Sequence, residues 1–205
     1  YYINNLHKHK LLIYTMIILS FDIGIKNLAY VILQINDDTI PNILDWEVIS
    51  LCDTESKVKD ISLITIGRNM QHILDSYFQT KWNIFSIDVV LIENQIGPLA
   101  IRMKTLQGMI TQYFIQKNIS QIEYWSSSNK LKPFLNENKK TNYRERKLLS
   151  IKVTLHLLDT FFNSWSHHYS SHKKKDDLSD CLVQCLNYSI KHNYTNIFNN
   201  ADNLK

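Results

Sequence analysis

The fold is decided by the stretch Ile17-Ile18-Leu19-Ser20-Phe21-Asp22-Ile23-Gly24-Ile25-Lys26-Asn27, in which an apolar run meets an aspartate and then a glycine. The run predicts a buried strand that ends at the aspartate, and the glycine marks a tight turn. A second apolar run, Leu28–Ile35, follows the turn, and a third, Trp46–Leu51, lies beyond the turn formers Asp37-Asp38 and Pro41-Asn42. We therefore expect three antiparallel strands joined by short turns.

Beyond these strands the apolar period becomes that of a helix. Apolar residues recur at three- and four-residue steps from Leu63 to Tyr77, and the run Asp88–Ile92 then predicts a central strand. The other expected elements are a helix at Leu99–Gln116, a strand at Gln121–Ser126, and helices at Glu145–Phe162 and Lys175–Lys191. This order predicts an α/β fold whose mixed sheet has three antiparallel strands and then parallel strands, with helices on both faces.

Length and composition agree with one folded domain. A chain of 205 residues has room for one sizeable core, and 44% hydrophobic against 20% charged residues is typical of a soluble protein. Three cysteines cannot form a disulfide framework, so we expect an intracellular, reducing compartment. The apolar run Leu11–Leu19 imitates a signal peptide, but it lacks a small-residue cleavage site and is too short to cross a membrane.

Acidic residues stand at the ends of three predicted elements. Asp22 ends the first strand and Glu93 ends the fourth, while Asp177 and Asp180 lie at the start of the last helix. The three-residue spacing puts both of these aspartates on one helical face. If the first and fourth strands are neighbours, their carboxyl ends meet and the helix can close over them. Taken alone, each acid also has a structural explanation, as a turn former, a surface residue or a helix N-terminal residue.

Together the four carboxylates predict a metal site. Crowded carboxylates repel one another unless cations lie between them, and hard oxygen ligands favour Mg²⁺ or Mn²⁺ over Zn²⁺. Two such ions roughly 4 Å apart activate a water and stabilise the leaving oxygen of a phosphodiester. We therefore expect Asp22, Glu93, Asp177 and Asp180 to be catalytic metal ligands in hydrolysis of a nucleic-acid backbone, with no small-molecule cofactor.

A basic segment accompanies the acids. Between Asn129 and Lys152 eight lysines and arginines are set against two glutamates, and Phe134 and Tyr143 are interleaved with them. This pattern is typical of a surface that attracts a phosphate backbone. A solvated surface loop is the alternative.

Several of these motifs resemble those of the poxvirus-type Holliday junction resolvases, relatives of bacterial RuvC. Asp22–Asn27 is similar to the first-strand motif of that family, and Tyr143–Lys147 and Lys175–Asp180 are similar to its basic segment and its last acidic motif. The stretches Ile92–Gln95 and Arg102–Gly108 resemble versions from large DNA viruses and from mitochondria. The resemblance runs in order over residues 16–192, so we expect residues 1–15 to be an extension and 193–205 a tail.

The resemblance implies an RNase H-like fold, a homodimer, Mg²⁺ dependence, and paired symmetric nicks across a four-way DNA junction. It places the four acids on the catalytic carboxylates of the family. The residues expected to contact DNA are Lys26, Arg102, Lys104, Lys139, Lys140, Arg144, Arg146 and Lys147. Richness in Ile, Asn, Lys and Tyr fits a large DNA virus acting in the host cytoplasm, and a mitochondrial location is the alternative.

The helix expected after Glu93 is the candidate dimer contact. Leu99, Met103, Leu106 and Ile110 step by four and three, which is the seam spacing of a coiled coil. Packing of these side chains on the sheet of the same chain is the alternative.

Rival functions and a rival metal remain open at this point. Another nuclease on the same fold, acting on RNA–DNA hybrids or other branched DNA, would use the same carboxylates, and a DNA-binding protein without catalysis could keep the fold. Zinc is a second metal to consider, since histidines precede two cysteines spaced four apart on the last helix. That ligand set would be His167, His168, His172, Cys181 and Cys185, although both cysteines also suit a buried face. His168 or His172 could instead contact the scissile phosphate.

Overall fold

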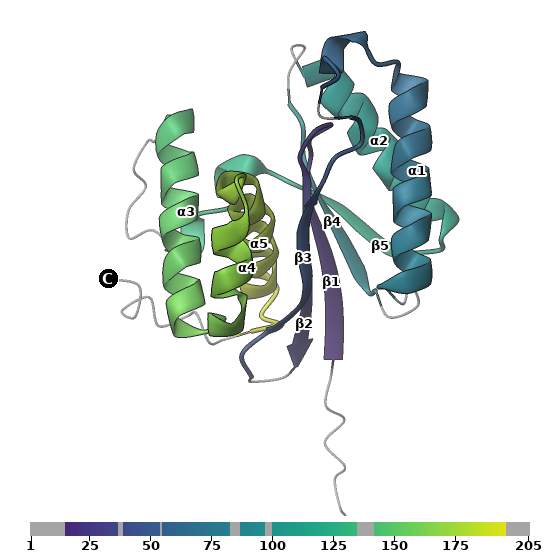
Figure 1. The fold of residues 1–205 in the computed structure, drawn as a ribbon. Coiled ribbons are helices and arrows are strands. Elements are labelled where there is room, and N and C mark those ends of the chain that lie inside the picture. Colours follow the sequence, from purple (N-terminus) through teal and green to yellow (C-terminus); the bar gives the residue numbers. More distant parts are fainter. Residues whose placement is uncertain are drawn as a thin grey trace, which may run out of the picture.

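The computed structural model describes residues 15–36, 39–53, 55–82, 87–96, 100–134 and 142–195. These residues form a five-stranded sheet in the order β3-β2-β1-β4-β5 (Figure 1). β1 (Thr15–Asp22), β2 (Leu28–Asn36) and β3 (Asn42–Ile49) pair antiparallel, whereas β4 (Val89–Glu93) pairs parallel with β1, and β5 (Gln121–Trp125) pairs parallel with β4. The predicted fold class, a mixed sheet covered by helices, is confirmed.

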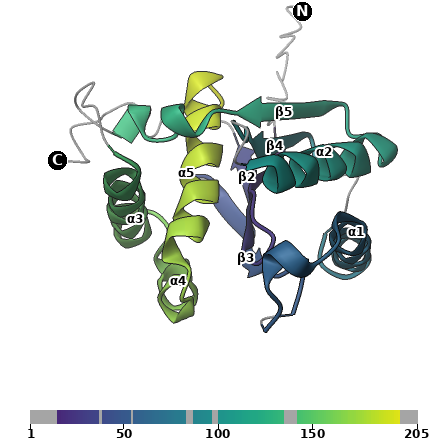
Figure 2. The ribbon, with the colours of Figure 1, turned by 90° about the horizontal axis from the view of Figure 1, so that it is seen from above.

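Helices cover both faces of the sheet (Figure 2). α1 (Leu63–Thr80) and α2 (Ile101–Gln116) lie on one face. α3 (Tyr143–Thr160), α4 (Ser166–Ser171) and α5 (Lys175–Lys191) lie on the other. Short 3₁₀ turns connect them: η1 (Val58–Asp60), η4 (Ser127–Asn129), η5 (Lys132–Phe134) and η6 (Asn163–Trp165). Among the described residues, no helix combines the length and the apolar character needed to cross a membrane.

The central strands are apolar on both sides because each face of the sheet has its own core. In β1, Ile18 belongs to the core under α3 and α5, and Leu19 belongs to the core under α1 and α2. Both side chains are fully buried. This explains why β1 is a continuous apolar run rather than an alternating one.

Three local features go beyond what the sequence predicts. The turn after β1 needs Gly24, because a Cβ there would clash with the carbonyl oxygen of Asn27. β3 begins at Asn42, which pairs with Gln34, and so is longer than the predicted run from Trp46. The short α4 is not predicted, since six residues are too few to show a helical apolar period.

Candidate active site

The parallel pairing of β1 and β4 brings two of the predicted acids together. Phe21 pairs with Ile92, so the next residues, Asp22 and Glu93, end neighbouring strands. α5 then supplies Asp177 and Asp180 from its first turns. Asp22 and Asp177 are buried, with 8% and 9% of their surface exposed. We name these four acids the carboxylate cluster.

Hydrogen bonds dock α5 against the strands and so fix the position of its aspartates. The side-chain amide of Gln184 donates to the Ser20 hydroxyl at 3.0 Å and to the Phe21 carbonyl at 3.1 Å. From β3, the indole of Trp46 donates to the Leu178 carbonyl at 3.1 Å. Because α5 is tied to β1 at the residue before Asp22, the aspartates of the helix and of the strand face one site.

A lysine that sequence reasoning did not assign to this site lies at its centre. The Nζ of Lys130 is 2.9 Å from Glu93, 3.2 Å from Asp22 and 3.7 Å from Asp180. The Lys130 side chain is 4% exposed. Three carboxylates from three separate elements therefore converge on one buried ammonium group. The sequence places Lys130 in the basic segment, but only the fold shows that it points inward.

Burial and crowding shift the pKa values of this group. Burial raises the pKa of Asp22 well above its ordinary value, and the carboxylates of Glu93 and Asp180 add to the effect against the opposing charge of Lys130. Burial alone would raise the pKa of Glu93, but the charge of Lys130 and the hydrogen bonds with Asp22 and Gln95 lower it overall. Burial alone would lower the pKa of Lys130, and its three carboxylate neighbours raise it instead. The cluster thus holds more negative charge than one ammonium balances.

Lys147 forms a second cationic centre beside the first. Its Nζ contacts the carboxylate of Asp176 and lies 3.6 Å from Asp177. Burial and the neighbouring Asp176 raise the pKa of Asp177, and Lys147 only partly opposes that shift. Asp177 is therefore paired with Lys147, whereas the other three acids of the cluster surround Lys130.

Two cavities open on the carboxylate cluster. The larger, about 400 Å³, is lined by Asp22, Asp177, Lys26, Met103, Lys147 and residues of the β1–β2 turn. The smaller, about 80 Å³, is lined by Glu93, Asp180, Lys130, Tyr143, Arg146 and Lys147. Lys147 lines both, so the acids and several predicted DNA-binding cations share one concave region.

The predicted DNA-binding residues lie in different surroundings. Lys26, Arg146 and Lys147 line the two cavities, and Arg144 is exposed on the first turn of α3. Lys104 is exposed and donates to Asn94 at 3.2 Å, beside the end of β4. Lys139 and Lys140 lie outside the described residues.

Arg102 has a structural role that its sequence position does not reveal. Its guanidinium group donates to the backbone carbonyls of Val58, at 3.0 Å, and of Ile61. These hydrogen bonds tie the start of α2 to the segment around η1. We therefore no longer expect Arg102 to be a main DNA contact.

The predicted dimer contact on α2 is wrong for two of its residues. Leu106 and Ile110 are fully buried in the core under α1 and α2, so their side chains pack on the chain's own sheet. Met103 is partly buried and lines the larger active-site cavity. Leu99 lies outside the described residues. Apolar residues at three- and four-residue steps are typical both of a helix that packs on a sheet and of a coiled coil. In this protein the apolar face of α2 packs on the sheet.

The combined histidine and cysteine zinc site is also wrong. Cys181 and Cys185 are fully buried in the core, and neither belongs to the group of candidate metal ligands found among the described residues. His168 and His172 instead face Glu47 of β3, a residue that no sequence motif singles out. His167 is exposed.

Comparison with solved structures identifies the class of fold. A fowlpox virus resolvase, solved in complex with its substrate Holliday junction DNA, matches with a TM-score of 0.61 and 21% identity over 86% of this chain and 99% of the other. The yeast mitochondrial Holliday junction resolvase Ydc2 matches with 0.56 and 18%, over 86% and 82%. Thermus thermophilus RuvC matches with 0.57 and 13%, over 86% and 97%. The fold is therefore the RNase H-like fold of RuvC, as the sequence predicts.

The family follows from the sequence itself. The model of the family described as poxvirus A22 protein matches residues 16–192, and the chain belongs to that family. No curated protein matches the chain. The predicted resemblance to the poxvirus-type proteins is confirmed.

Proposed function

We propose that the protein is a divalent-metal-dependent endonuclease that resolves four-way DNA junctions. The observation that carries the proposal is the convergence of Asp22, Glu93 and Asp180 on one buried cation, Lys130, beside a concave basic surface. Membership of the poxvirus A22 protein family supports it, as does the likeness to resolvases solved with Holliday junction DNA. Family membership also supports action on viral DNA in the host cytoplasm.

The donor set of the carboxylate cluster fits Mg²⁺ or Mn²⁺. All four side chains offer hard oxygen atoms, and a divalent cation would oppose the rise in the pKa of Asp22 that burial and then the carboxylates of Glu93 and Asp180 cause. Asp22, Glu93, Asp177 and Asp180 would hold two ions, which supply a nucleophilic hydroxide and charge stabilisation when bound. The positions of the four side chains and the chemistry of their donor atoms support these assignments.

The protein's own cations would position the DNA strand. Arg146 and Lys147 line the cavities beside the acids, so they are placed to contact the phosphates that flank the scissile bond. Lys130, held beneath the acids, would neutralise charge that the metal ions leave unbalanced. Arg144 and Lys104, both exposed, would contact the backbone further from the cut.

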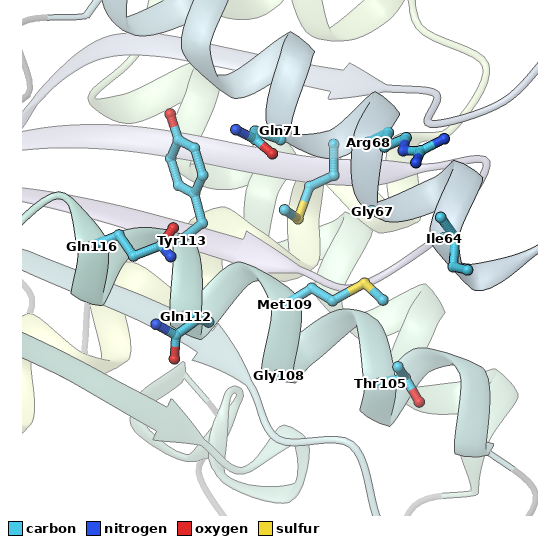
Figure 3. Close-up of a pocket in the computed structure, with 11 residues that line it drawn as sticks. Ile64, Gly67, Arg68, Gln71, Thr105, Gly108, Met109, Gln112, Tyr113 and Gln116 are labelled. Carbon is cyan, nitrogen blue, oxygen red and sulfur yellow. The ribbon is translucent and has the colours of Figure 1, made fainter.

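Two copies are needed to cut a junction symmetrically, because a two-fold substrate presents two equivalent strands and the described part of each chain contributes one carboxylate cluster. We propose that the second copy docks on the groove between α1 and α2, which replaces the buried face predicted from sequence. Figure 3 shows this groove, with Ile64 and Gly67 of α1 facing Gly108 and Met109 of α2. It encloses about 550 Å³, and the Ile64 side chain on its rim is 66% exposed.

The groove can be tested by oligomeric state. A Cβ added at Gly108 would meet no atom within 4 Å, so Gly108→Glu adds a charge to the groove without a clash at the start of its side chain. Light scattering at micromolar concentration should show a dimer for the wild type and a monomer for the variant. A variant that still dimerises would place the interface elsewhere.

The experiment that tests the proposed function is cleavage of synthetic substrates with Mg²⁺. We expect paired, symmetric nicks in a four-way junction and much slower cutting of duplex, flap and RNA–DNA hybrid. Preferential cutting of the hybrid would favour the rival nuclease, and tight junction binding without any cut would favour a non-catalytic DNA-binding protein. Asp22→Asn, run in parallel, excludes a contaminating nuclease.

A further inference from the structure

A second group of metal-ligating side chains lies apart from the carboxylate cluster. Glu47 is on β3, His168 is in α4, and His172 caps the end of that helix. One ligand atom of each residue lies within 4.8 Å of the other two. The two imidazole rings are 4.4 Å apart between centroids, because a four-residue step places them on one helical face. We name these three residues the histidine cluster.

Backbone carbonyls fix the orientation of both rings. The Nε2 of His168 is 2.6 Å from the Trp46 carbonyl, and the Nδ1 of His172 is 2.9 Å from the His168 carbonyl. A carbonyl only accepts hydrogen bonds, so each of these nitrogens carries a hydrogen. In a neutral ring the other nitrogen then keeps its lone pair, which is Nδ1 in His168 and Nε2 in His172. This outer arrangement is typical of histidines that bind metal ions.

The contact between His172 and Glu47 suits a shared cation when Nδ1 of His172 is the nitrogen that carries the hydrogen. The Nε2 of His172 lies 2.6 Å from Oε1 of Glu47, and two lone pairs at that separation would repel. A proton is one solution, and it gives an ion pair between His172 and Glu47. A metal ion is the other, since it replaces the proton and bonds both atoms.

We propose that Glu47, His168 and His172 bind one Zn²⁺-class transition-metal ion. Two imidazole nitrogens and one carboxylate oxygen form a ligand set that suits Zn²⁺ and is a poor one for Mg²⁺. All three side chains are half-buried, so solvent can reach the ion and water can complete its coordination. The site therefore differs in chemistry from the carboxylate cluster.

The position of the ion gives it a structural consequence. It would fasten α4 to the edge strand β3, where His168 already bonds the Trp46 carbonyl and Trp46 bonds Leu178 of α5. Only Lys173 and Lys174 separate His172 from α5, whose first turns hold Asp177 and Asp180. Zinc binding would thus restrain the segment that leads into the active-site helix.

The test is zinc titration of the full chain by calorimetry in a large excess of Mg²⁺, so that the carboxylate cluster is occupied. We expect one Zn²⁺ equivalent for the wild type, and loss of that equivalent in His172→Ala and in His168→Ala. His167→Ala is the matched control, since this exposed neighbour on α4 should leave zinc binding unchanged. Glu47→Gln keeps size and hydrogen bonding but removes the charge, and it should weaken the binding.

Two further measurements keep the result independent of folding defects. Co²⁺ should give the intense visible bands of a four-coordinate site in the wild type and not in Glu47→Gln, a variant checked for native circular dichroism. Zn²⁺ should also slow amide hydrogen exchange across residues 166–174. Absence of saturable zinc binding by the wild type, or zinc binding by both histidine variants as tight as that of the wild type, would overturn the proposal and leave only a Glu47–His172 ion pair. Since the readout is metal binding, failure to cleave a junction would leave this site intact and count against the proposed nuclease alone.

Discussion

The carboxylate cluster and the histidine cluster suit different cations, although only Lys173 and Lys174 separate His172 from α5, which carries two of the acids. The first offers only oxygen atoms, from two strand ends and a helix, and already surrounds the ammonium of Lys130. The second offers two ring nitrogens and one carboxylate, with backbone carbonyls holding the rings. The acids of the carboxylate cluster repel one another, and burial and neighbouring carboxylates raise the pKa of Asp22, whereas a contact of 2.6 Å joins His172 to Glu47. The donor atoms of the first cluster therefore suit a hard divalent cation, and those of the second suit a transition-metal ion.

The largest effect expected from this difference is on cleavage. Asp22→Asn, Glu93→Gln and Asp180→Asn should each reduce junction cutting with Mg²⁺ by orders of magnitude, because each removes a metal ligand and charge at the reacting phosphate. Junction binding should survive, since the basic residues that bind phosphates supply most of it. Single-turnover cleavage and gel-shift assays on one junction measure the two quantities separately.

The matched variant in the histidine cluster is Glu47→Gln, which should cut at close to the wild-type rate. If two of the three acid variants also cut near that rate, the assignment of the carboxylate cluster is wrong. A Glu47→Gln rate as low as those of the acid variants would mean that the two clusters are not functionally distinct.

The second effect concerns the buried ammonium group. Lys130→Met leaves three carboxylates without their cation, and breaking a buried ion pair from one side costs about 3 kcal/mol of folding stability. Because Mg²⁺ would replace the missing charge, it should restore more stability to this variant than it adds to the wild type. Urea unfolding with and without Mg²⁺ measures both. Lys132→Met, an exposed lysine two residues further on, is the control; equal losses for both variants would refute the central role of Lys130.

A smaller effect, of opposite sign, is expected for Asp22→Asn in the absence of metal. The folded-state pKa of Asp22 lies above its ordinary value of 3.8, so its contribution to stability is fully present at lower pH and is lost as pH rises through the folded pKa. In Asp22→Asn the amide cannot ionise, so the variant does not lose this stability as the pH rises. The variant should therefore melt higher than the wild type at pH 7 without metal, and this gain should disappear near pH 4. A variant that melts lower at both pH values would show that the carboxylate is stabilised rather than crowded.

The sequence predicts the carboxylate cluster because strand ends and helix starts are visible in it, and the parallel pairing of β1 with β4 then brings Asp22 to Glu93. It does not reveal Lys130, since nothing in a short irregular segment shows that a lysine points inward. Nor does it reveal Glu47, whose partners are more than a hundred residues away on α4. The apolar step of α2 is visible, but periodicity shows only that a helix has a buried face and does not show what covers it. For that reason the dimer prediction fails at Leu106 and Ile110, which pack on the sheet.

The smallest expected effect separates cations that serve DNA from those that serve the fold. Replacing Arg144, Arg146 and Lys147 together by glutamine should flatten the salt dependence of junction binding by about one unit of slope for each phosphate that the variant no longer neutralises. Lys147 already contacts Asp176 and Asp177, so its share of the slope should be the smallest without metal and should grow once metal ions occupy the carboxylate cluster.

Arg102→Gln is the control and should leave the slope unchanged. It should instead lower the melting temperature, because the guanidinium group of Arg102 donates to the carbonyls of Val58 and Ile61. Fluorescence anisotropy of a labelled junction over a salt series measures the slopes. An unchanged slope in the triple variant would mean that the basic first turn of α3 is a solvated surface without phosphate contacts. A flattened slope for Arg102→Gln would mean that Arg102 contacts DNA after all.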